Sequence, residues 1–333
     1  MNAWELRRGA GIDSLHRTTR APSTLDAREV RIRVHAVSLN ARDLGNAASG
    51  DGRLVPASDA AGVVEAIGGG VTRWRIGDRV APAFYPQWIE GLPTGDRTVG
   101  SLGGGADGVL ADAFVAHEDA LFAIPEHLDF VEGATLPTAA LTAWHALFEV
   151  VTLAPGDTVV LLGTGGVSTW ALTLAHAAGL RTIVTSSDDA KLDRARTLGA
   201  DDTINYRTHP DWEREVLRLT GGRGADLVVD VGGEGTLGHS IAAVRAGGTV
   251  AMVGGVSGGF GARLEPFALI GGAKRLAGVL VGSRAMAESL VRFVAQRGLR
   301  PVIDRVFPFD DAPAAFAHLA SGRHFGKVGI AIG

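Results

Sequence analysis

Hydrophobic and polar residues alternate with a period of two in the first 125 residues, as in strands with one buried face. The clearest such segment covers residues 30–37, where arginines alternate with apolar residues. Two further strands are predicted at 62–67 and 79–83, next to glycine-rich turns. Residues 86–108 show little periodicity and many Gly, Pro and Asp residues, so they predict a long surface loop. This part of the chain is therefore expected to be rich in β-structure.

From about residue 158 the pattern changes to short apolar runs that alternate with helical segments. Strands are predicted at 159–162, 181–185, 203–205, 227–230 and 249–253. Helices are predicted between them at 169–178, 189–198, 211–220 and 236–244. Strands that alternate with helices form parallel sheets, and near-continuous apolar strands fit a sheet that is covered on both faces. The pattern therefore predicts an α/β fold with a doubly wound parallel sheet.

The C-terminal part of the chain does not continue this alternation. An apolar run at 276–281 precedes an amphipathic helix at 285–297, and strands are predicted at 302–307 and 328–332. We therefore expect both chain ends, residues 1–125 with 270–333, to form one β-rich domain. A nucleotide-binding domain of residues 126–269 is expected to interrupt it.

Composition narrows the function classes. A chain of 333 residues with 46% hydrophobic and 20% charged residues can bury real cores and is not expected to be disordered. Its net charge of −4 lacks the basic excess of nucleic-acid binders, so no nucleic-acid partner is expected. The absence of cysteine excludes disulfides, cysteine-ligated zinc, iron–sulfur clusters and thiol nucleophiles. The sequence shows neither a signal-peptide pattern nor an apolar run of membrane-spanning length, so we expect a cytoplasmic protein without a membrane partner.

A glycine-rich turn lies directly between the first predicted strand of the parallel sheet and its first helix. The first glycine permits a tight turn, the second lets the backbone approach a pyrophosphate, and the helix N-terminus offers N–H groups to phosphates. Ser168 stands where a third glycine is usual. The strand–turn–helix context nevertheless predicts a dinucleotide-binding site. Its predicted residues are Gly163, Thr164, Gly165, Gly166 and Val167.

The end of the second strand of the sheet indicates which dinucleotide binds. NAD sites usually place an acid there, whereas Ser186 and Ser187 follow this strand and the first acid is Asp188. Ser186 can donate a hydrogen bond to a 2′-phosphate, and Lys191 can add positive charge. Tyr206, after the third strand, can donate its hydroxyl hydrogen or stack. These residues favour NADP(H), while Asp188 and its neighbour Asp189 are the main argument for NAD.

Several segments, spread over nearly the whole chain, resemble the medium-chain dehydrogenase/reductase superfamily, in particular its zinc-lacking, quinone-oxidoreductase-like members. The resemblance implies a GroES-like β-rich catalytic domain, a Rossmann domain and an active site in the cleft between them. Relatives commonly form homodimers or homotetramers, which we expect here too. The matching segments are Ser-Leu-Asn-Ala-Arg-Asp-Leu at 38–44, Ser-Asp-Ala-Ala-Gly-Val-Val at 58–64, Gly-Asp-Arg-Val at 77–80, Leu-Pro-Thr-Ala-Ala-Leu-Thr-Ala-Trp at 136–144 and His-Phe-Gly-Lys-Val at 324–328.

The resemblance also bears on metal. Zinc-dependent relatives hold a catalytic zinc with Cys, His and Cys, with a Glu beside the His. The matching positions here are Asn40, Ser58 with Asp59, and Thr138, which do not form a tetrahedral zinc set. The segment that matches the structural-zinc lobe of those relatives contains no cysteine. No bound zinc is therefore expected.

Without zinc, hydrogen-bond donors must polarise a substrate carbonyl. The resemblance places Asn40 and Thr138 near the nicotinamide and the substrate, and these two residues with Asp43 are the candidate catalytic residues. For Asp43 and Asp59, structural hydrogen bonding is favoured over acid–base chemistry. Several relatives carry Tyr after the Asn, where this chain has Ala41, so the proton donor stays open between water, a cofactor ribose hydroxyl and Tyr85.

The expected activity is the NADPH-dependent reduction of a quinone, enone or aldehyde, or the reverse oxidation of an alcohol, so the expected partner is a small molecule. Reduction of an enoyl thioester and non-catalytic NADPH binding, as in a sensor, are the alternatives. The predicted cofactor site also includes Gly232, Val253, Gly254, Val281, Phe325 and Lys327.

Overall fold

The computed structural model describes residues 1–21 and 24–333 and consists of two compact units. The first contains Met1–Leu141 with Val281–Gly333, and the second contains Thr142–Leu280. These limits correct the predicted boundaries. Residues 126–141 belong to the first unit because α3 (Phe130–Gly133) packs on its sheet. Residues 270–280 belong to the second unit because β14 (Arg275–Gly278) pairs with its sheet.

The sheet of the first unit joins strands from both ends of the chain. Within the described residues it has seven strands in the order β15–β16–β3–β5–β6–β8, with β7 also paired to β3. In β3, Val30, Ile32 and Val34 are buried, which explains the period-two pattern. The strands are β3 (Glu29–Leu39), β5 (Asp59–Ile67), β6 (Arg79–Pro82), β7 (Ala113–His117), β8 (Leu121–Ala123), β15 (Ile303–Pro308) and β16 (Lys327–Ala331).

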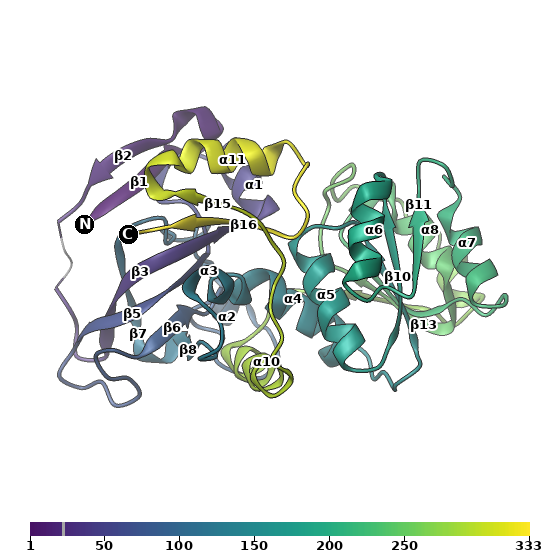
Figure 1. Ribbon diagram of the computed structural model, residues 1–333, viewed down its shortest axis with the longest axis horizontal. Coiled ribbons are helices and arrows are strands. Elements are labelled where there is room, and N and C mark those ends of the chain that lie inside the picture. The colour runs from purple at the N-terminus through teal and green to yellow at the C-terminus, as the bar shows by residue number, and fades with distance from the viewer. Residues whose placement is uncertain (22–23) are drawn as a thin grey trace. The chain divides into compact units, whose positions relative to one another are not determined.

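Further elements of the first unit surround this sheet (Figure 1). A smaller sheet has the order β2–β1–β4 and contains β2 (His16–Thr19), β1 (Asn2–Arg7) and β4 (Arg53–Leu54). The helix α11 (Ala312–Ala320), which the sequence did not predict, covers β15 and β16 and buries Phe316 in the core. The remaining helices are α1 (Ala41–Ala48), α2 (Gly95–Thr98), α10 (Arg284–Arg297) and a π-helical segment, Leu136–Ala140, from which α4 (Leu141–Trp144) continues the chain.

The second unit is a parallel sheet with the strand order β11–β10–β9–β12–β13–β14, and the predicted doubly wound α/β fold is confirmed. Every residue of β9 and β12 is buried, as expected for central strands with helices on both faces. The strands not yet bounded are β9 (Thr158–Leu162), β10 (Arg181–Ser186), β11 (Asp202–Asn205), β12 (Ala225–Asp230) and β13 (Val244–Met252). The helices are α5 (Gly166–Ala177), α6 (Asp189–Thr197), α7 (Trp212–Leu219), α8 (Leu237–Ala243) and α9 (Pro266–Ile270). No helix in residues 1–21 and 24–333 is long and apolar enough to cross a bilayer.

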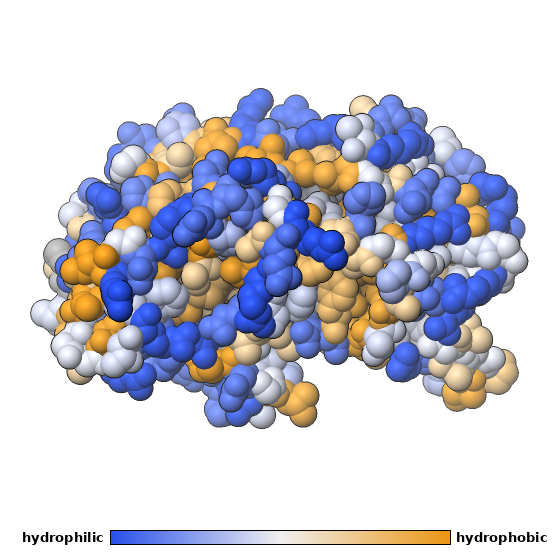
Figure 2. All heavy atoms as spheres, turned by 60° about the horizontal axis from the view of Figure 1, so that its bottom comes forward, coloured by the Kyte–Doolittle hydropathy of each residue, from blue (hydrophilic) through white to orange (hydrophobic). Residues whose placement is uncertain are grey.

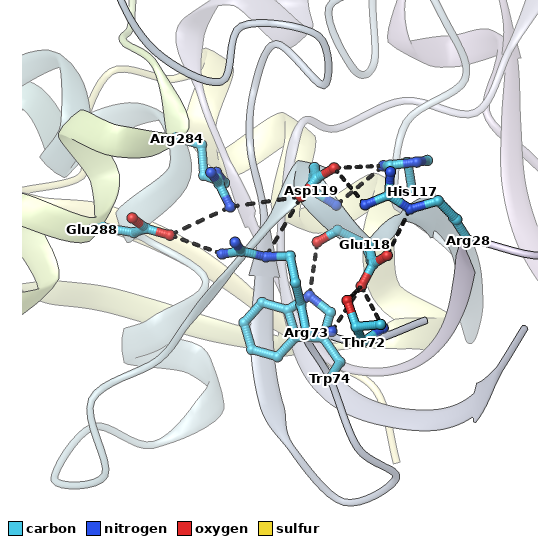
Figure 3. Close-up of polar contacts among 9 residues, drawn as sticks. All are labelled: Arg28, Thr72, Arg73, Trp74, His117, Glu118, Asp119, Arg284 and Glu288. Carbon is cyan, nitrogen blue, oxygen red and sulfur yellow. Dashed lines mark hydrogen bonds and ion pairs between the residues drawn. The ribbon is translucent and has the colours of Figure 1, made fainter. Parts of the chain in front are cut away.

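A buried carboxylate connects three segments of the first unit (Figure 3). Glu118 is fully buried just after β7 and accepts hydrogen bonds from Arg28 Nε at 2.8 Å, Thr72 N at 2.8 Å and Arg73 N at 2.7 Å. Burial by itself raises the pKa of Glu118, but these hydrogen bonds outweigh it and lower the pKa to about 2. Arg73 also contacts Glu288 of α10 at 3.1 Å, so the cluster links the helix to the sheet.

We expect Glu118→Gln to destabilise the protein by about 3 kcal/mol at neutral pH, because it removes the buried charge that its donors require. The lowered pKa means that this stabilisation is complete above about pH 4.5 and is lost as the pH falls towards 2. The loss caused by the substitution should therefore shrink in acid, as measured by urea unfolding over a pH series. Glu288→Gln is the control. It removes a partly exposed ion pair with Arg73 and should lower the free energy of unfolding much less. Equal losses in the two variants would contradict this account.

Candidate active site

Five polar side chains from four elements of the first unit form one hydrogen-bonded cluster. Asn40 is the N-cap of α1, Ser58 precedes β5, Asp59 begins β5, Thr138 lies in the π-helical segment and Lys327 begins β16. Ser58 and Asp59 are fully buried and Lys327 is 2% exposed, whereas Thr138 is 7% exposed and Asn40 is partly exposed. The structure thus brings together the predicted catalytic residues Asn40 and Thr138 with a lysine that was predicted to bind the cofactor.

Strand pairing explains how residues so distant in the sequence meet. Val328 of β16 pairs with Leu39 at the end of β3, so Lys327 arrives beside Asn40. On the other side of β3, Asp59 pairs with Ser38. Ala57, just before Ser58, has φ 69°, a left-handed conformation that is costly for a residue with a Cβ atom.

Asp59 uses its two carboxylate oxygens differently. Oδ1 accepts hydrogen bonds from Thr138 Oγ1 at 2.5 Å and from Ser58 Oγ at 3.1 Å. Oδ2 accepts a hydrogen bond from Asn40 Nδ2 at 2.8 Å and lies 3.7 Å from Lys327 Nζ. One oxygen therefore faces two hydroxyl groups, and the other faces an amide and an ammonium group.

Lys327 fixes the orientation of the Asn40 carboxamide. Its Nζ donates to Asn40 Oδ1 at 2.5 Å and to Leu39 O at 2.7 Å. With its oxygen on Lys327, the carboxamide directs its nitrogen towards Asp59 at 2.8 Å and Ser58 Oγ at 3.5 Å. Burial lowers the pKa of Lys327, while the neighbouring Asp59 and Asp43 act in the opposite direction.

Asp43, the third predicted catalytic residue, supports the cluster from α1. It is 1% exposed, and its Oδ2 accepts the backbone N–H of Asn40 at 2.8 Å. Among the described residues its Oδ1 is buried without a hydrogen-bond partner. Burial raises the pKa of Asp43 to about 6, against a smaller opposing effect of Arg42. The contacts give Asp43 a positioning role towards Asn40.

We expect Asp43→Asn to stabilise the protein at pH 8 by about 1–3 kcal/mol and to have little effect near pH 4. The reason is that the pKa of Asp43 in the folded protein, about 6, lies above its ordinary value of 3.8. The free energy of unfolding of the wild type therefore falls as the pH rises from about 4 to above 6. Chemical unfolding at several pH values measures the difference. Asp51→Asn, at an exposed acid, is the control. A stability difference that does not change with pH would refute the interpretation.

The cluster does not fit zinc. The sequence resemblance matches four of its residues, Asn40, Ser58, Asp59 and Thr138, to zinc-binding positions, but its oxygen and amide groups already bond to one another and to the Lys327 side chain. Zinc in proteins is typically held by Cys, His or acidic side chains in a tetrahedral set. Within residues 1–21 and 24–333, no group of three or more His, Cys, Asp or Glu side chains could hold a metal ion.

The predicted dinucleotide turn lies in the second unit between β9 and α5. Gly163 has φ 75°, and Gly165 is the N-cap of α5. A Cβ atom built on Gly163 or Gly165 would meet nothing within 4 Å, so both glycines border open space. Ser168 Oγ donates to Leu162 O at 2.6 Å, which accommodates this side chain where a third glycine is usual. The open turn and the helix N-terminus fit a bound pyrophosphate.

The contacts after β10 show what the acids of this region do. Asp188 caps α6 by accepting the backbone N–H groups of Ala190 at 2.9 Å and Lys191 at 3.2 Å. Asp189 accepts from Asn205 Nδ2 at 2.7 Å. Both acids therefore have partners within the protein. Ser186 and Tyr206 are adjacent, since Tyr206 N donates to Ser186 O at 3.0 Å, and the Tyr206 side chain is exposed.

The other predicted cofactor residues fall into both units. Gly232, Val253 and Gly254 follow β12 and β13, and Val253 N donates to Asp230 O at 2.8 Å. Val281 and Phe325 belong to the first unit, where Phe325 is buried. Tyr85, one of the open proton donors, packs edge-on against Phe84, and burial raises its pKa.

Comparisons with known proteins agree with these observations. The family described as "Alcohol dehydrogenase GroES-like domain" matches residues 26–126, and that described as "Zinc-binding dehydrogenase" matches residues 166–296. A "Zinc-type alcohol dehydrogenase-like protein" of Schizosaccharomyces pombe is 40% identical over 93% of both chains. A "Quinone oxidoreductase" of Pseudomonas aeruginosa is 30% identical over 92% of both.

Solved structures extend the similarity to the complete fold. One from Sinorhizobium meliloti 1021, assigned to the alcohol dehydrogenases, is 42% identical with a TM-score of 0.90 and covers 99% of both chains. An "NAD-dependent alcohol dehydrogenase" is 33% identical with the same TM-score and covers 100% of both. The chain is therefore an oxidoreductase of the medium-chain dehydrogenase/reductase superfamily.

Proposed function

We propose that this protein is a zinc-independent, NADPH-dependent oxidoreductase that reduces a quinone, enone or aldehyde, or oxidises the corresponding alcohol. The observation that carries the proposal is the cluster of Lys327, Asn40, Asp59, Ser58 and Thr138, which holds hydrogen-bonded polar groups and an ammonium ion at positions where zinc-dependent relatives hold their metal. When bound, the reduced nicotinamide supplies the hydride. The chain's own polar side chains then orient the substrate oxygen.

The cluster presents two side chains to a substrate. Thr138 and Asn40 retain exposed surface, whereas Ser58, Asp59 and Lys327 are buried behind them. One amide hydrogen of Asn40 is held by Asp59 at 2.8 Å, while the other faces Ser58 Oγ only at 3.5 Å. Both amide hydrogens therefore have partners in the cluster, and a carbonyl oxygen would compete with the longer contact to Ser58.

The test is cofactor oxidation, followed at the nicotinamide absorbance with a panel of quinones, enones, aldehydes and enoyl thioesters. Turnover with a quinone, enone or aldehyde and NADPH supports the proposal. Turnover confined to enoyl thioesters would assign a different substrate class. Tight NADPH binding without any turnover would favour a sensor. Protein purified with zinc present should contain well under one zinc per chain, and a chelator should leave its activity unchanged.

The preference for NADPH is expected to depend on Lys191, because its ammonium group, on the first turn of α6, suits a 2′-phosphate. Lys191→Ala should weaken NADPH binding by about tenfold or more and barely change NADH binding, since a charge-assisted hydrogen bond contributes about 1.5–3 kcal/mol. Titration calorimetry with both cofactors measures the effect, and Arg194→Ala on the same helix is the control. Tighter binding of NADH by the wild type, in keeping with the NAD-dependent relative, would defeat the prediction.

We further propose that two copies associate through the second unit. On the face in Figure 2, hydrophobic side chains gather in separate groups among hydrophilic ones. Exposed large hydrophobic residues are concentrated in residues 256–280, where Phe260 is 81%, Phe267 77% and Ile270 71% exposed. β14 in the same segment is an edge strand whose outer side can pair with a second copy. Light scattering of the purified protein tests for a dimer or tetramer.

A further inference from the structure

We infer that Asp59 is the proton reservoir of the reaction and that the Thr138 hydroxyl passes the proton between Asp59 and the substrate oxygen. The inference rests on the proposed function and identifies a proton donor for it. It assigns an acid–base role to a carboxyl group for which the sequence favours structural hydrogen bonding. It also distinguishes the two hydroxyl groups of the cluster, because only that of Thr138 belongs to a side chain with exposed surface.

Burial and distance support the order of the relay. Thr138 Oγ1 donates directly to Asp59 Oδ1 at 2.5 Å, so no group intervenes between the hydroxyl and the carboxylate. Asp59 is fully buried, so a substrate cannot touch it, whereas Thr138 is 7% exposed. A proton from Asp59 must therefore pass through a group that both Asp59 and the substrate can reach. Thr138 meets this requirement, while Ser58 is fully buried.

The hydrogen atoms of the cluster agree with transfer in both directions. A threonine hydroxyl has one hydrogen and two lone pairs. The hydrogen of Thr138 points to Asp59, so a lone pair of Oγ1 can accept the hydroxyl hydrogen of an alcohol substrate. As a hydride leaves the alcohol carbon, the alcohol proton moves to Thr138 Oγ1, and the former Thr138 proton moves to Asp59 Oδ1. An alcohol thereby becomes a carbonyl compound, with one hydride lost to the cofactor and one proton gained by Asp59.

In the reducing direction the same bonds form and break in reverse. The carbonyl carbon gains the hydride and its oxygen takes the Thr138 proton, while protonated Asp59 replaces that proton and becomes a carboxylate. Lys327 Nζ at 3.7 Å and Asn40 Nδ2 at 2.8 Å face the other oxygen and stabilise the charge that remains. After the product leaves, a proton from the solvent reaches Asp59 through water at Thr138, so each reduction consumes one solvent proton. Asp43 on α1 is a second nearby carboxyl group. Its negative charge and that of Asp59 repel each other.

Three variants of threonine test the relay in the NADPH-loaded enzyme with its best carbonyl substrate. Thr138→Val keeps the shape but removes the hydroxyl, and we expect kcat to fall by about 100-fold with a larger solvent isotope effect. Thr138→Ser should restore most of the activity and the wild-type isotope effect. Thr135→Val is the matched control, because it removes a buried hydroxyl of the same segment that donates to Glu132 O at 2.7 Å. It should leave kcat unchanged.

A second readout does not require turnover. Difference infrared spectroscopy over a pH series should show a carboxyl band that disappears in Asp59→Asn and shifts in Thr138→Val, because the latter removes the hydrogen bond to Oδ1. A kcat of Thr138→Val close to that of the wild type, or an Asp59 band unaffected by this variant, would overturn the relay. If no acceptor is turned over by the wild type, the proposed function fails, and the infrared result alone decides whether Thr138 and Asp59 share a proton.

Discussion

Replacement of Lys327 with methionine is expected to destabilise the protein by about 3–5 kcal/mol at pH 8, since it leaves buried partners of a charge without compensation. Methionine has a similar length and packs well, so the lost interactions are those of the ammonium group. Leu39 O and Asn40 Oδ1 would lose their donor, and Asp59 would lose the cation at 3.7 Å. Urea unfolding of the two proteins measures the difference.

The pH dependence of this loss distinguishes an electrostatic effect from a packing defect. Lys327 lowers the pKa of the buried Asp43, so its removal raises that pKa further above about 6. A raised carboxyl pKa costs stability above it and nothing once the group is protonated. The variant should therefore lose less stability at pH 5 than at pH 8.

Lys274→Met is the matched control for this measurement. Lys274 is a partly buried lysine of the second unit that donates to Ile241 O at 2.5 Å, and no carboxylate contributes to its lowered pKa. Its replacement should cost about 1 kcal/mol, the usual contribution of one hydrogen bond. Equal losses in the two lysine variants would mean that the cluster gains nothing from the charge of Lys327.

The second unit could be predicted from the sequence almost element by element. Its strands pair in parallel and are connected by helices. The sequence of this unit therefore alternates between apolar runs and helical segments. In the first unit the predicted elements that form are the strands β3, β5, β6, β15 and β16 and the helix α10. Strands β1, β2, β7 and β8 are short or have mixed burial, so their formation depends on distant partners rather than on a local pattern.

The candidate site shows the same division between local and long-range information. The glycine turn at Gly163 is visible in the sequence because the strand, turn and helix are contiguous. The place of Lys327 depends on the pairing of Val328 with Leu39, which no local pattern reveals. The contacts of Asp59 likewise depend on side chains from three other elements, namely Asn40, Thr138 and Lys327. A sequence pattern can therefore nominate residues for a site, but the contacts among them require the structure.

Asn40→Ala is expected to lower kcat by about 100-fold or more, since removal of one donor from a site that stabilises a developing oxyanion typically has this effect. NADPH affinity should stay close to that of the wild type, because the predicted phosphate contacts lie around Gly163 and Lys191 in the second unit. Steady-state kinetics with the best acceptor, together with calorimetric titration of NADPH, measure the two quantities.

The contacts of Asn40 explain why its replacement should affect more than one hydrogen-bond donor of the site. Its oxygen holds Lys327 at 2.5 Å and its nitrogen holds Asp59 at 2.8 Å, so alanine removes the bridge between the buried cation and the buried carboxylate. Asn40→Asp keeps an oxygen for Lys327 but places a second carboxylate beside Asp59, and it should also be slow, most of all at high pH. Near-normal kcat in Asn40→Ala would show that Lys327 and Asp59 hold their places without the carboxamide. The polarising donor would then have to be another group that reaches the substrate.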